Sequence, residues 1–483
     1  MASASRGTVE RFEGLGRLFP RSNRILARLR HAFIVILVYA SIAPVLGSIA
    51  PRSLDYEYAN VQDSLERWNQ SLEQRTNFFP GLPSDLWATS PEVSFQSIKR
   101  LAELGDGNYE SLLGLAYSYG WGVNPDKREA LRWLRKGTEK NIAPAQTGLG
   151  ELLITGAAGE TNKAEAVRLF EKAAAKGLAE AQFQLAVCYH FGHGTGIDFN
   201  EARRLYESAD RQNYPPATCN LAGLYDRGQG VERDFVKSLE LYRRAAAQGY
   251  AMAIHAVGVS YARAEGVPQD FSEAAKWYRR AAVLGYPPAQ HNLGNALMNG
   301  RGVIRAPIEA EKWFRRAAEA GILESLAAHA MLVLSGEVPG DSKAALAELQ
   351  NAANRGNPFA QAVLGAIYAR TSPEVRFLGL PEDYESAIWF LVPSSQAGQP
   401  VAQHALGILY ASGRGVGQDK AEAFKWLTLA TRAGYSNAEP DLRKLRDDIT
   451  AAEMAEGLRR ANAFKPTAGP NDADGEKFLP RPQ

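Results

Sequence analysis

The sequence predicts an all-α fold, an α-solenoid of about nine helix–turn–helix repeats with an N-terminal transmembrane helix. Three observations predict it. A unit of about 36 residues recurs along most of the 483-residue chain. Each unit holds two short amphipathic stretches separated by glycines, and an uncharged apolar run lies near the N-terminus. The 45% hydrophobic composition is sufficient for a large folded array.

The repeats can be aligned on their opening residue. Successive copies are separated by 36 residues six times, then by 35 and by 42. A constant period of this length is typical of a solenoid built from helix pairs. The nine copies open at Tyr109, Ala145, Ala181, Ala217, Ala253, Ala289, Ser325, Ala360 and Ala402.

The first stretch of each copy predicts an amphipathic helix. A large apolar residue is followed by a small one, as in Leu293-Gly294, and the small residue allows a neighbouring helix to approach closely. One turn later most copies carry a tyrosine on the same face. Glycines such as Gly300 and Gly302 then end the helix, because they tolerate left-handed backbone angles.

The second stretch carries the larger apolar load. Its stop position holds only Gly or Asn, for example Asn213 and Gly321, the residues that best tolerate a left-handed position after a helix. We expect a pair of large side chains in each second helix to enter the core. These pairs are Trp133-Leu134, Leu169-Phe170, Leu205-Tyr206, Trp277-Tyr278, Trp313-Phe314, Trp389-Phe390 and Trp426-Leu427.

The pattern A-x-x-x-L-G-x-x-Y-x-x-G-x-G-V, followed by A-x-x-W-[YF]-x-x-A-A-x-x-G, resembles the Sel1-like repeat, a relative of the tetratricopeptide repeat. The resemblance covers Tyr109 to about Ala438 and implies stacked helix pairs that mediate protein–protein interaction. Copies seven and eight depart from the pattern. His329-Ala330 replaces Leu-Gly in copy seven, and copy eight contains an insertion around Thr371 to Pro381.

The N-terminal residues predict a membrane anchor. Residues 1–31 form a basic arm, and residues 32–51 contain no charge. Twenty helical residues span roughly 30 Å, enough to cross a bilayer. The arginines of the arm place the N-terminus in the cytoplasm and the repeats on the far, extracytoplasmic side, in the periplasm if the source is bacterial.

Two alternatives remain open for this segment. Ser48-Ile49-Ala50 is a small-x-small tripeptide that a signal peptidase could cleave, which would give a soluble exported binding protein. The long apolar run and Pro51 in the first mature position favour an uncleaved signal anchor. A mitochondrial transit peptide is the second alternative, because the arm is rich in arginine and poor in acidic residues.

The segments around the repeats predict caps and linkers. Residues 52–90 form a juxtamembrane helix and linker, and residues 91–108 an N-terminal half repeat that caps the array. The nine repeats occupy 109–438. Residues 439–464 form a C-terminal capping helix, and the proline-rich residues 465–483 a disordered tail.

Composition and motifs argue against an enzyme and against nucleic-acid binding. The 55 basic and 53 acidic residues balance, which gives no pull toward nucleic acid. No nucleophile–base arrangement, phosphate-binding loop or cofactor motif is present. Cys188, His190 and His193 could ligate zinc, and Cys188 could pair with Cys219, but a surface-turn histidine beside a helical cysteine is the simpler interpretation.

Two further sets of residues repeat in register. His255, His291 and His404 share one position of their copies, and we interpret them as partly buried residues with ordinary hydrogen bonds rather than a pH-responsive row. The second set consists of arginine pairs in the second helices, interpreted as a solvated outer face, with a basic rail for an acidic partner or lipid as the alternative. The pairs are Arg243-Arg244, Arg279-Arg280 and Arg315-Arg316.

The resemblance places the first helices along a concave groove, so their variable polar residues are the candidate partner-binding positions. Amide and guanidinium donors suit a peptide backbone or carboxylate. We therefore expect a membrane-anchored scaffold or adaptor for a protein or peptide partner, in signalling, envelope assembly or quality control. The alternative is an envelope enzyme such as a peptidoglycan-linked hydrolase. The candidate groove residues are Asn220, Arg227, Arg263, Asn292, Asn295 and Asn299.

Overall fold

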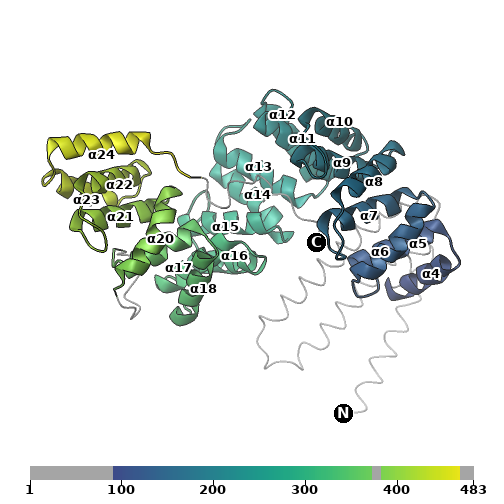
Figure 1. The fold of residues 1–483 in the computed structure, drawn as a ribbon, viewed down its shortest axis with the longest axis horizontal. Helices are drawn as coiled ribbons and strands as arrows, with labels where there is room; N and C mark the ends of the chain where they lie inside the picture. The colour runs from purple at the N-terminus through teal and green to yellow at the C-terminus, as the bar shows by residue number, and fades with distance from the viewer. Residues whose placement is uncertain (1–90, 372–381, 468–483) are drawn as a thin grey trace, which may run out of the picture. The chain divides into compact units, whose positions relative to one another are not determined.

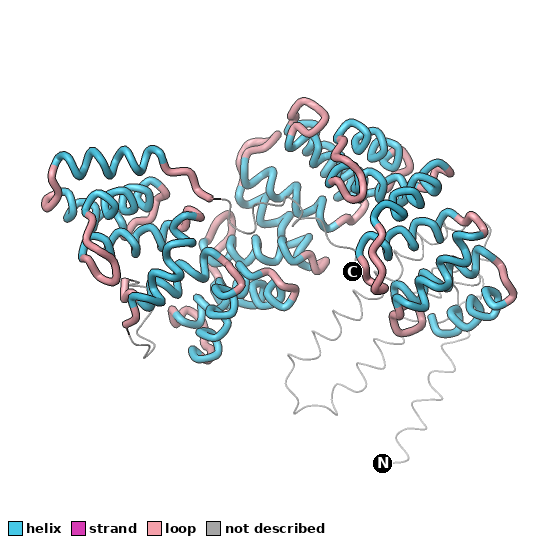
Figure 2. Tube along the Cα trace, in the orientation of Figure 1, coloured by secondary structure: helices cyan, strands magenta, loops and turns pink. Residues whose placement is uncertain are grey.

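The structure is a computed structural model that describes residues 91–371 and 382–467. These residues form 21 helices joined by turns, and no strand occurs among them (Figures 1 and 2). The predicted all-α class and the array of helix pairs are confirmed.

The helices alternate between first and second helices of successive copies (Figure 1). Each first helix packs on its own second helix, which in turn packs on the first helix of the next copy. Helix α4, Pro91–Glu103, precedes the first copy and packs on α5. The pairs are α5 Gly107–Tyr119 and α6 Lys127–Glu139, α7 Ala143–Thr155 and α8 Lys163–Ala175, α9 Ala179–Phe191 and α10 Phe199–Asp210, α11 Pro215–Arg227 and α12 Phe235–Ala247, α13 Ala251–Arg263 and α14 Phe271–Val283, α15 Pro287–Asn299 and α16 Pro307–Glu319, α17 Leu323–Leu334 and α18 Ser342–Asn354, α19 Pro358–Tyr368 and α20 Tyr384–Gln396, and α21 Pro400–Ser412 and α22 Lys420–Arg432.

Side-chain caps begin the second helices. The Asp270 carboxylate, for example, accepts hydrogen bonds from the backbone N–H groups of Ser272 and Glu273, which have no partner inside the helix. Helix α16 lacks this cap and starts instead with Pro307, which needs no N–H partner. The same capping geometry is provided by Asp126, Asn162, Asp198, Asp234, Asp341, Asp383 and Asp419.

Left-handed residues end the helices where the sequence predicted them. Asn141 and Asn213 have φ of 62° and 57°, and the stop glycines also have positive φ. Ala264 adopts φ of 61° at the end of α13, where six other first helices use glycine. An L-residue with a Cβ is strained there, so the turn geometry is maintained against local preference.

The small residue of each first helix lies against a large side chain of its partner helix. A Cβ atom at Gly294 would lie 2.6 Å from Cε1 of Phe314, whose ring is fully buried. A Cβ at Gly258 would lie 2.8 Å from the Tyr278 ring in the same way. The large–small pairs of the sequence therefore form the contact between the two helices of a copy.

The predicted core pair of copy eight is wrong by one residue. Trp389 is 77% exposed, whereas Leu391 is fully buried and packs on α19, where a Cβ at Gly365 would lie 2.7 Å from Leu391 Cγ. Every core pair begins seven residues after the N-cap, and seven residues after Asp383 is Phe390. The insertion within copy eight, between α19 and α20, moved the register of the second helix, and aligning Trp389 with the tryptophans of other copies concealed the shift. Trp389 falls where other copies carry a basic residue, exposed in Arg132, Arg168, Arg204, Lys276 and Lys312 and half-buried in Lys425.

The C-terminal cap consists of two helices instead of the single helix predicted over 439–464. Helix α23, Ala438–Arg446, ends at Asp447, and α24, Ala451–Ala463, starts with a capping box between Thr450 and Glu453. Helix α24 approaches α22 so closely that a Cβ at Gly457 would lie 2.6 Å from the Ala421 carbonyl oxygen. The two helices therefore cover the end of the array.

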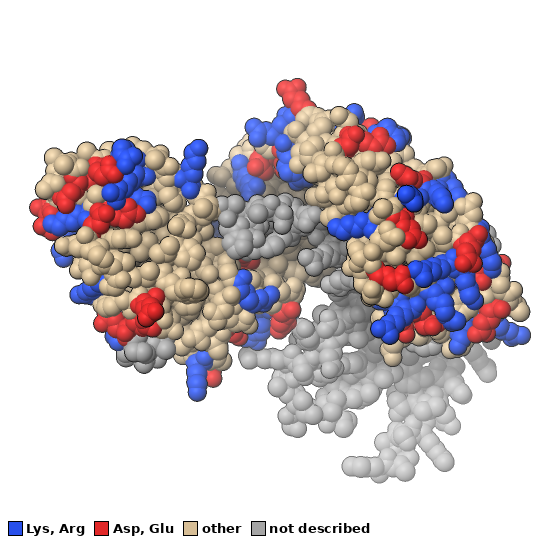
Figure 3. Space-filling model, viewed as in Figure 1, with Lys and Arg blue, Asp and Glu red and all other residues tan. Residues whose placement is uncertain are grey.

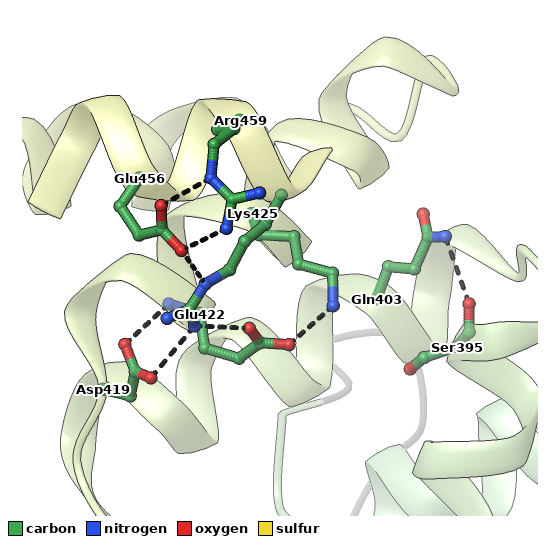
Figure 4. Close-up of polar contacts among 8 residues, drawn as sticks. Ser395, Gln403, Asp419, Glu422, Lys425, Glu456 and Arg459 are labelled. Atoms are coloured by element: carbon green, nitrogen blue, oxygen red, sulfur yellow. Dashed lines mark hydrogen bonds and ion pairs between the residues drawn. The ribbon is translucent and has the colours of Figure 1, made fainter. Parts of the chain in front are cut away.

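An arginine attaches α24 to α22. Arg460 Nη1 lies 3.1 Å from Asp419 Oδ2 and 2.8 Å from Glu422 Oε2, and Arg460 Nε lies 2.8 Å from Glu456 Oε1. Figure 4 shows Asp419, Glu422 and Glu456 converging from the two helices. Arg459, one residue earlier, pairs only with Glu456 of its own helix at 2.7 Å among the interactions of the described region.

Several predictions concern residues outside the described part of the chain. These are the arm 1–31, the anchor 32–51, the linker 52–90 and the tail from residue 468. Within the described ranges, no helix is both long and apolar enough to cross a membrane. The first residues of the predicted disordered tail are ordered, since the Thr467 N–H donates to the Gln396 carbonyl at 2.9 Å.

Candidate partner-binding groove

A groove of about 770 Å³ crosses the middle of the array. The last turn of α9, the first helices α11, α13 and α15, and the start of α17 line it. Its apolar part includes Tyr242, Met252, Val259, Tyr286 and Ile322. Successive copies thus contribute equivalent helices to one surface, as expected for stacked repeats.

Four of the six predicted residues line this groove, namely Asn220, Arg227, Arg263 and Asn292. The other two are not among its lining residues. Asn295 donates to His291 Nε2 at 2.8 Å, and Asn299 is exposed and donates to the Asn295 carbonyl at 2.9 Å.

A hydrogen-bonded chain connects Asn220 to Arg227. Asn220 Nδ2 donates to Tyr206 Oη at 3.2 Å, and Tyr206 Oη lies 3.3 Å from His190 Nδ1. His190 Nε2 lies 3.1 Å from Gln229 Oε1, which also accepts from Arg227 Nε at 2.8 Å. Because an amide oxygen only accepts, His190 carries its proton on Nε2, and its Nδ1 accepts from the Tyr206 hydroxyl.

This chain requires a neutral His190. Burial, and to a smaller extent the nearby positive charge of Arg227, together lower the pKa of His190 to about 4. The neutral ring therefore donates on one side and accepts on the other at neutral pH. The side chains that line the groove are fixed by groups from three helices, α9, α10 and α11.

The histidines that share one register also have polar partners. Asn292 Nδ2 lies 2.9 Å from His255 Nε2, and His291 Nδ1 lies 2.8 Å from Ser325 Oγ. Burial lowers the pKa of His255 to about 4 and also lowers the pKa of His291. At the C-terminal end, His404 Nε2 lies 2.7 Å from Asp441 Oδ2.

Charged side chains of both signs lie along the groove. Arg227 and Arg263 are exposed, whereas Asp226 and Glu265 are half-buried. Burial raises the pKa of Asp226 and of Glu265, and the neighbouring arginines oppose that rise. The positive groups are therefore the outer charges of the central groove.

The arginine pairs of the outer face have intramolecular partners. Arg243 Nη2 donates to Tyr261 Oη at 2.9 Å, and Arg279 Nη1 lies 2.6 Å from Glu309 Oε1. Figure 3 shows basic and acidic side chains interspersed on the face in view. A partnered arginine has less to offer a ligand, so this face carries no candidate site. The remaining contacts are Arg244 with Asp210, Arg315 with Glu311, Arg280 over Trp277 and Arg316 over Trp313.

The residues considered as zinc ligands form part of the helix packing. Cys188 and Cys219 are both free and buried, and burial raises the pKa of each thiol to about 12. His190 belongs to the hydrogen-bonded chain above. No group of three or more histidine, cysteine or acidic side chains is arranged for a metal ion within residues 91–371 and 382–467.

Sequence reasoning missed Tyr206 and Gln229, the two residues that connect the groove side chains. Tyr206 is predicted only as a core residue, and Gln229 lies between the two glycines that end the first helix of its copy, where the repeat pattern specifies no residue type. Gln229 follows the last residue of α11 by two positions, so a polar side chain in that slot can return to the helix end. The two-residue spacing between the end of α11 and Gln229 was therefore the sequence signal for this contact.

Stacked helix pairs with a lined groove define a helical-repeat binding protein. The family model described as Sel1 repeat matches residues 110–142, 143–178, 179–214, 215–250, 251–286, 287–322 and 400–435. These stretches cover just over half of the chain, so it belongs to the Sel1 repeat family. Proteins of this family generally mediate protein–protein interaction. Copies seven and eight, which depart from the pattern, are the unmatched ones.

Solved structures include similar chains. A protective antigen present in uropathogenic Escherichia coli strains is 23% identical, covers 78% of this chain and 96% of its own, and has a TM-score of 0.46. A Sel1 repeat protein from Oxalobacter formigenes is 27% identical over 47% of this chain and 91% of its own, with a TM-score of 0.43. An immunity protein from Pseudomonas aeruginosa is 22% identical over 44% of this chain and 78% of its own, with a TM-score of 0.31. No curated protein matches the chain.

Proposed function

We propose that this protein is a non-enzymatic scaffold or adaptor that binds a segment of a partner protein in the central groove. The groove carries the proposal, because equivalent helices of successive copies line it with apolar surface and fixed polar groups. Such a surface suits an extended chain, which can contact one copy after another along its length. The general role of the family in protein–protein interaction supports the same function.

The proposal includes a membrane anchor at residues 32–51, with the N-terminus in the cytoplasm and the repeats on the far side. It rests on the uncharged run and the preceding arginines. Such a scaffold would present its groove to partners in signalling, envelope assembly or quality control. Deleting residues 32–51 should move the protein from the membrane to the soluble fraction after alkaline extraction. An intact chain that is already extracted by alkali would contradict the anchor.

Site-specific photocrosslinking tests the groove. One variant carries a photoreactive residue at Ala256, which lies in the groove, and the control carries it at Lys312, exposed on the outer face. We expect a discrete adduct from native membranes with the first variant only. Equal adducts from both positions, or an adduct from Lys312 alone, would show that the groove is not the binding surface.

A further inference from the structure

Two arginines end the first helices of adjacent copies in the groove. Arg227 is the last residue of α11 and Arg263 the last residue of α13, and both line the groove and are exposed. The first helices of the neighbouring copies end in uncharged residues at this place. These are Tyr119, Thr155, Phe191 and Asn299.

The Arg227 guanidinium is held over the groove surface. Its Nε donates to Gln229 Oε1 at 2.8 Å. A Cβ at Gly223 would lie 2.9 Å from Arg227 Nη2, so this glycine leaves the room that the guanidinium occupies. Among the ion pairs of the described residues none involves Arg227. One edge of the guanidinium is therefore fixed, while its Nη groups can donate to a ligand.

The second arginine is only weakly engaged. Arg263 Nη1 lies 4.0 Å from Glu265 Oε1, at the limit of an ion pair, and the Arg263 side chain is 69% exposed against 23% for Glu265. Asp226 is half-buried. A ligand entering from solvent thus meets the two guanidinium groups before it meets the two carboxylates.

The length of the groove and the positions of the two arginines define which ligand it can bind. The groove continues past both arginines, from the last turn of α9 to the start of α17, so a chain can pass through it. Because the two arginines end equivalent helices of adjacent copies, an extended chain that advances about 3.3 Å per residue reaches both within a few residues. We propose that the groove binds an extended segment of a partner protein whose two acidic side chains, a few residues apart, pair with Arg227 and Arg263. This inference rests on the proposed function of the groove.

Two guanidinium groups in consecutive copies favour side-chain carboxylates over a chain terminus. A C-terminal carboxylate supplies one negative charge and would leave one arginine without a partner. Two acidic side chains can each accept the paired N–H bonds that a guanidinium donates.

The test measures peptide binding to the full-length protein in detergent. The probes are fluorescent peptides, acetylated and amidated at their ends, with two aspartates separated by about two to five residues in a Leu-Ser background. Matched peptides carry asparagine instead. We expect the best aspartate pair to bind at least about tenfold more tightly than its asparagine match, and the advantage to shrink at high salt.

Variants assign the effect to residues. Arg227→Gln and Arg263→Gln should each remove most of the aspartate advantage, and Gln229→Ala should remove part of it by releasing the Arg227 guanidinium. Arg168→Gln, an exposed arginine of α8 outside the groove, is the control and should change nothing. Circular dichroism verifies that each variant is folded.

The outcomes separate this inference from the groove function. Equal binding of aspartate and asparagine peptides, or no effect of Arg227→Gln, overturns acidic recognition. If acidic recognition fails in this way but Ala256→Trp, which fills the groove, still abolishes binding of both peptides, the groove binds a partner segment without selecting acidic side chains. If Ala256→Trp leaves binding intact, both proposals are wrong. A third peptide set has the same sequences with a free C-terminal carboxylate. If only this set shows the aspartate preference, the groove recognises a chain end and the side-chain proposal is wrong.

Discussion

The centre of the array and its C-terminal end both contain buried and half-buried polar groups, but the partners of these groups differ. In the centre, His190 faces Tyr206 and Gln229, and His255 faces Asn292, so each histidine has neutral partners. At the C-terminal end, His404 faces Asp441 and Arg460 faces three carboxylates. In the centre, neutral partners fix the groove side chains without adding charge. At the C-terminal end, ion pairs attach α24 to α22.

Because the partners differ, the stability of the two regions should depend on different solution conditions. A network of neutral groups depends on histidines remaining unprotonated, and therefore on pH. A set of exposed or half-exposed ion pairs depends on salt, because ions screen charges near the surface. The centre and the end should therefore fail under different conditions, and the following predictions test that separation.

The largest effect is expected from a core substitution in the centre. Phe314 is fully buried against Gly294, so Phe314→Ala should cost about 3–5 kcal/mol of unfolding free energy. Because each copy contacts only its neighbours, hydrogen exchange should rise in the copies on both sides. Leu445→Ala in α23 is the comparison and should raise exchange only in α22 to α24. Equal exchange throughout the array in both variants would mean that it unfolds as one unit.

The second largest effect is expected from acid, which should destabilise the centre of the array. His190 and His255 have folded pKa values of about 4, below the ordinary value of about 6.5. Between these values the unfolded chain binds protons that the folded chain does not, so stability falls as pH drops from about 6.5 to 4. The loss approaches about 3 kcal/mol per histidine at the lower limit.

Urea unfolding of His255→Gln across this pH range measures the effect. As the pH falls, the variant should lose less stability than the parent, by about the contribution of one histidine. The charged Arg263 and the titratable His291 beside position 255 remain in both proteins. Its stability at pH 7 provides the reference. An unchanged slope would show that His255 titrates normally in the folded protein.

A smaller effect is expected from the ionic attachment of α24. Arg460→Met removes the contacts to Asp419 and Glu422 and should cost about 1 kcal/mol, seen as faster exchange and proteolysis of α24 alone. High salt should weaken the parent in the same region. Arg459→Met is the matched control, because Arg459 pairs within α24. If both variants release α24 equally, the pairing to α22 does not hold it.

The smallest effect tests the corrected register of copy eight. Trp389→Lys should change stability by less than about 0.5 kcal/mol, because Trp389 is exposed where other copies carry basic residues. Trp426→Lys, at a true core position that is 5% exposed, should cost about 3 kcal/mol or more. Thermal unfolding distinguishes them. A large loss of stability in Trp389→Lys would show that Trp389 is a core residue, as its alignment with the tryptophans of other copies predicts.

The repeat positions and their stops could be predicted because they follow from local chemistry. Only Gly and Asn occupy the left-handed stop after the second helices, as Asn141 and Asn213 show, and the spacing does not depend on distant residues. The N-cap aspartates were equally readable and would have corrected the register of Trp389. The two-residue spacing of Arg227 and Gln229 was also a local signal, whereas the contact of His190 with Tyr206 between helices could not be predicted from spacing, since it depends on how side chains meet in space.

The close approach of α24 to α22 bears on how such a chain could have grown. Where Gly457 meets the Ala421 carbonyl, the surface that a further copy would stack on is already occupied by α24. Tandem duplication of a copy in the interior adds a unit between two compatible surfaces. Duplication after copy nine would have to displace this helix, so the last copy acts as a fixed terminus while the number of copies before it is free to change.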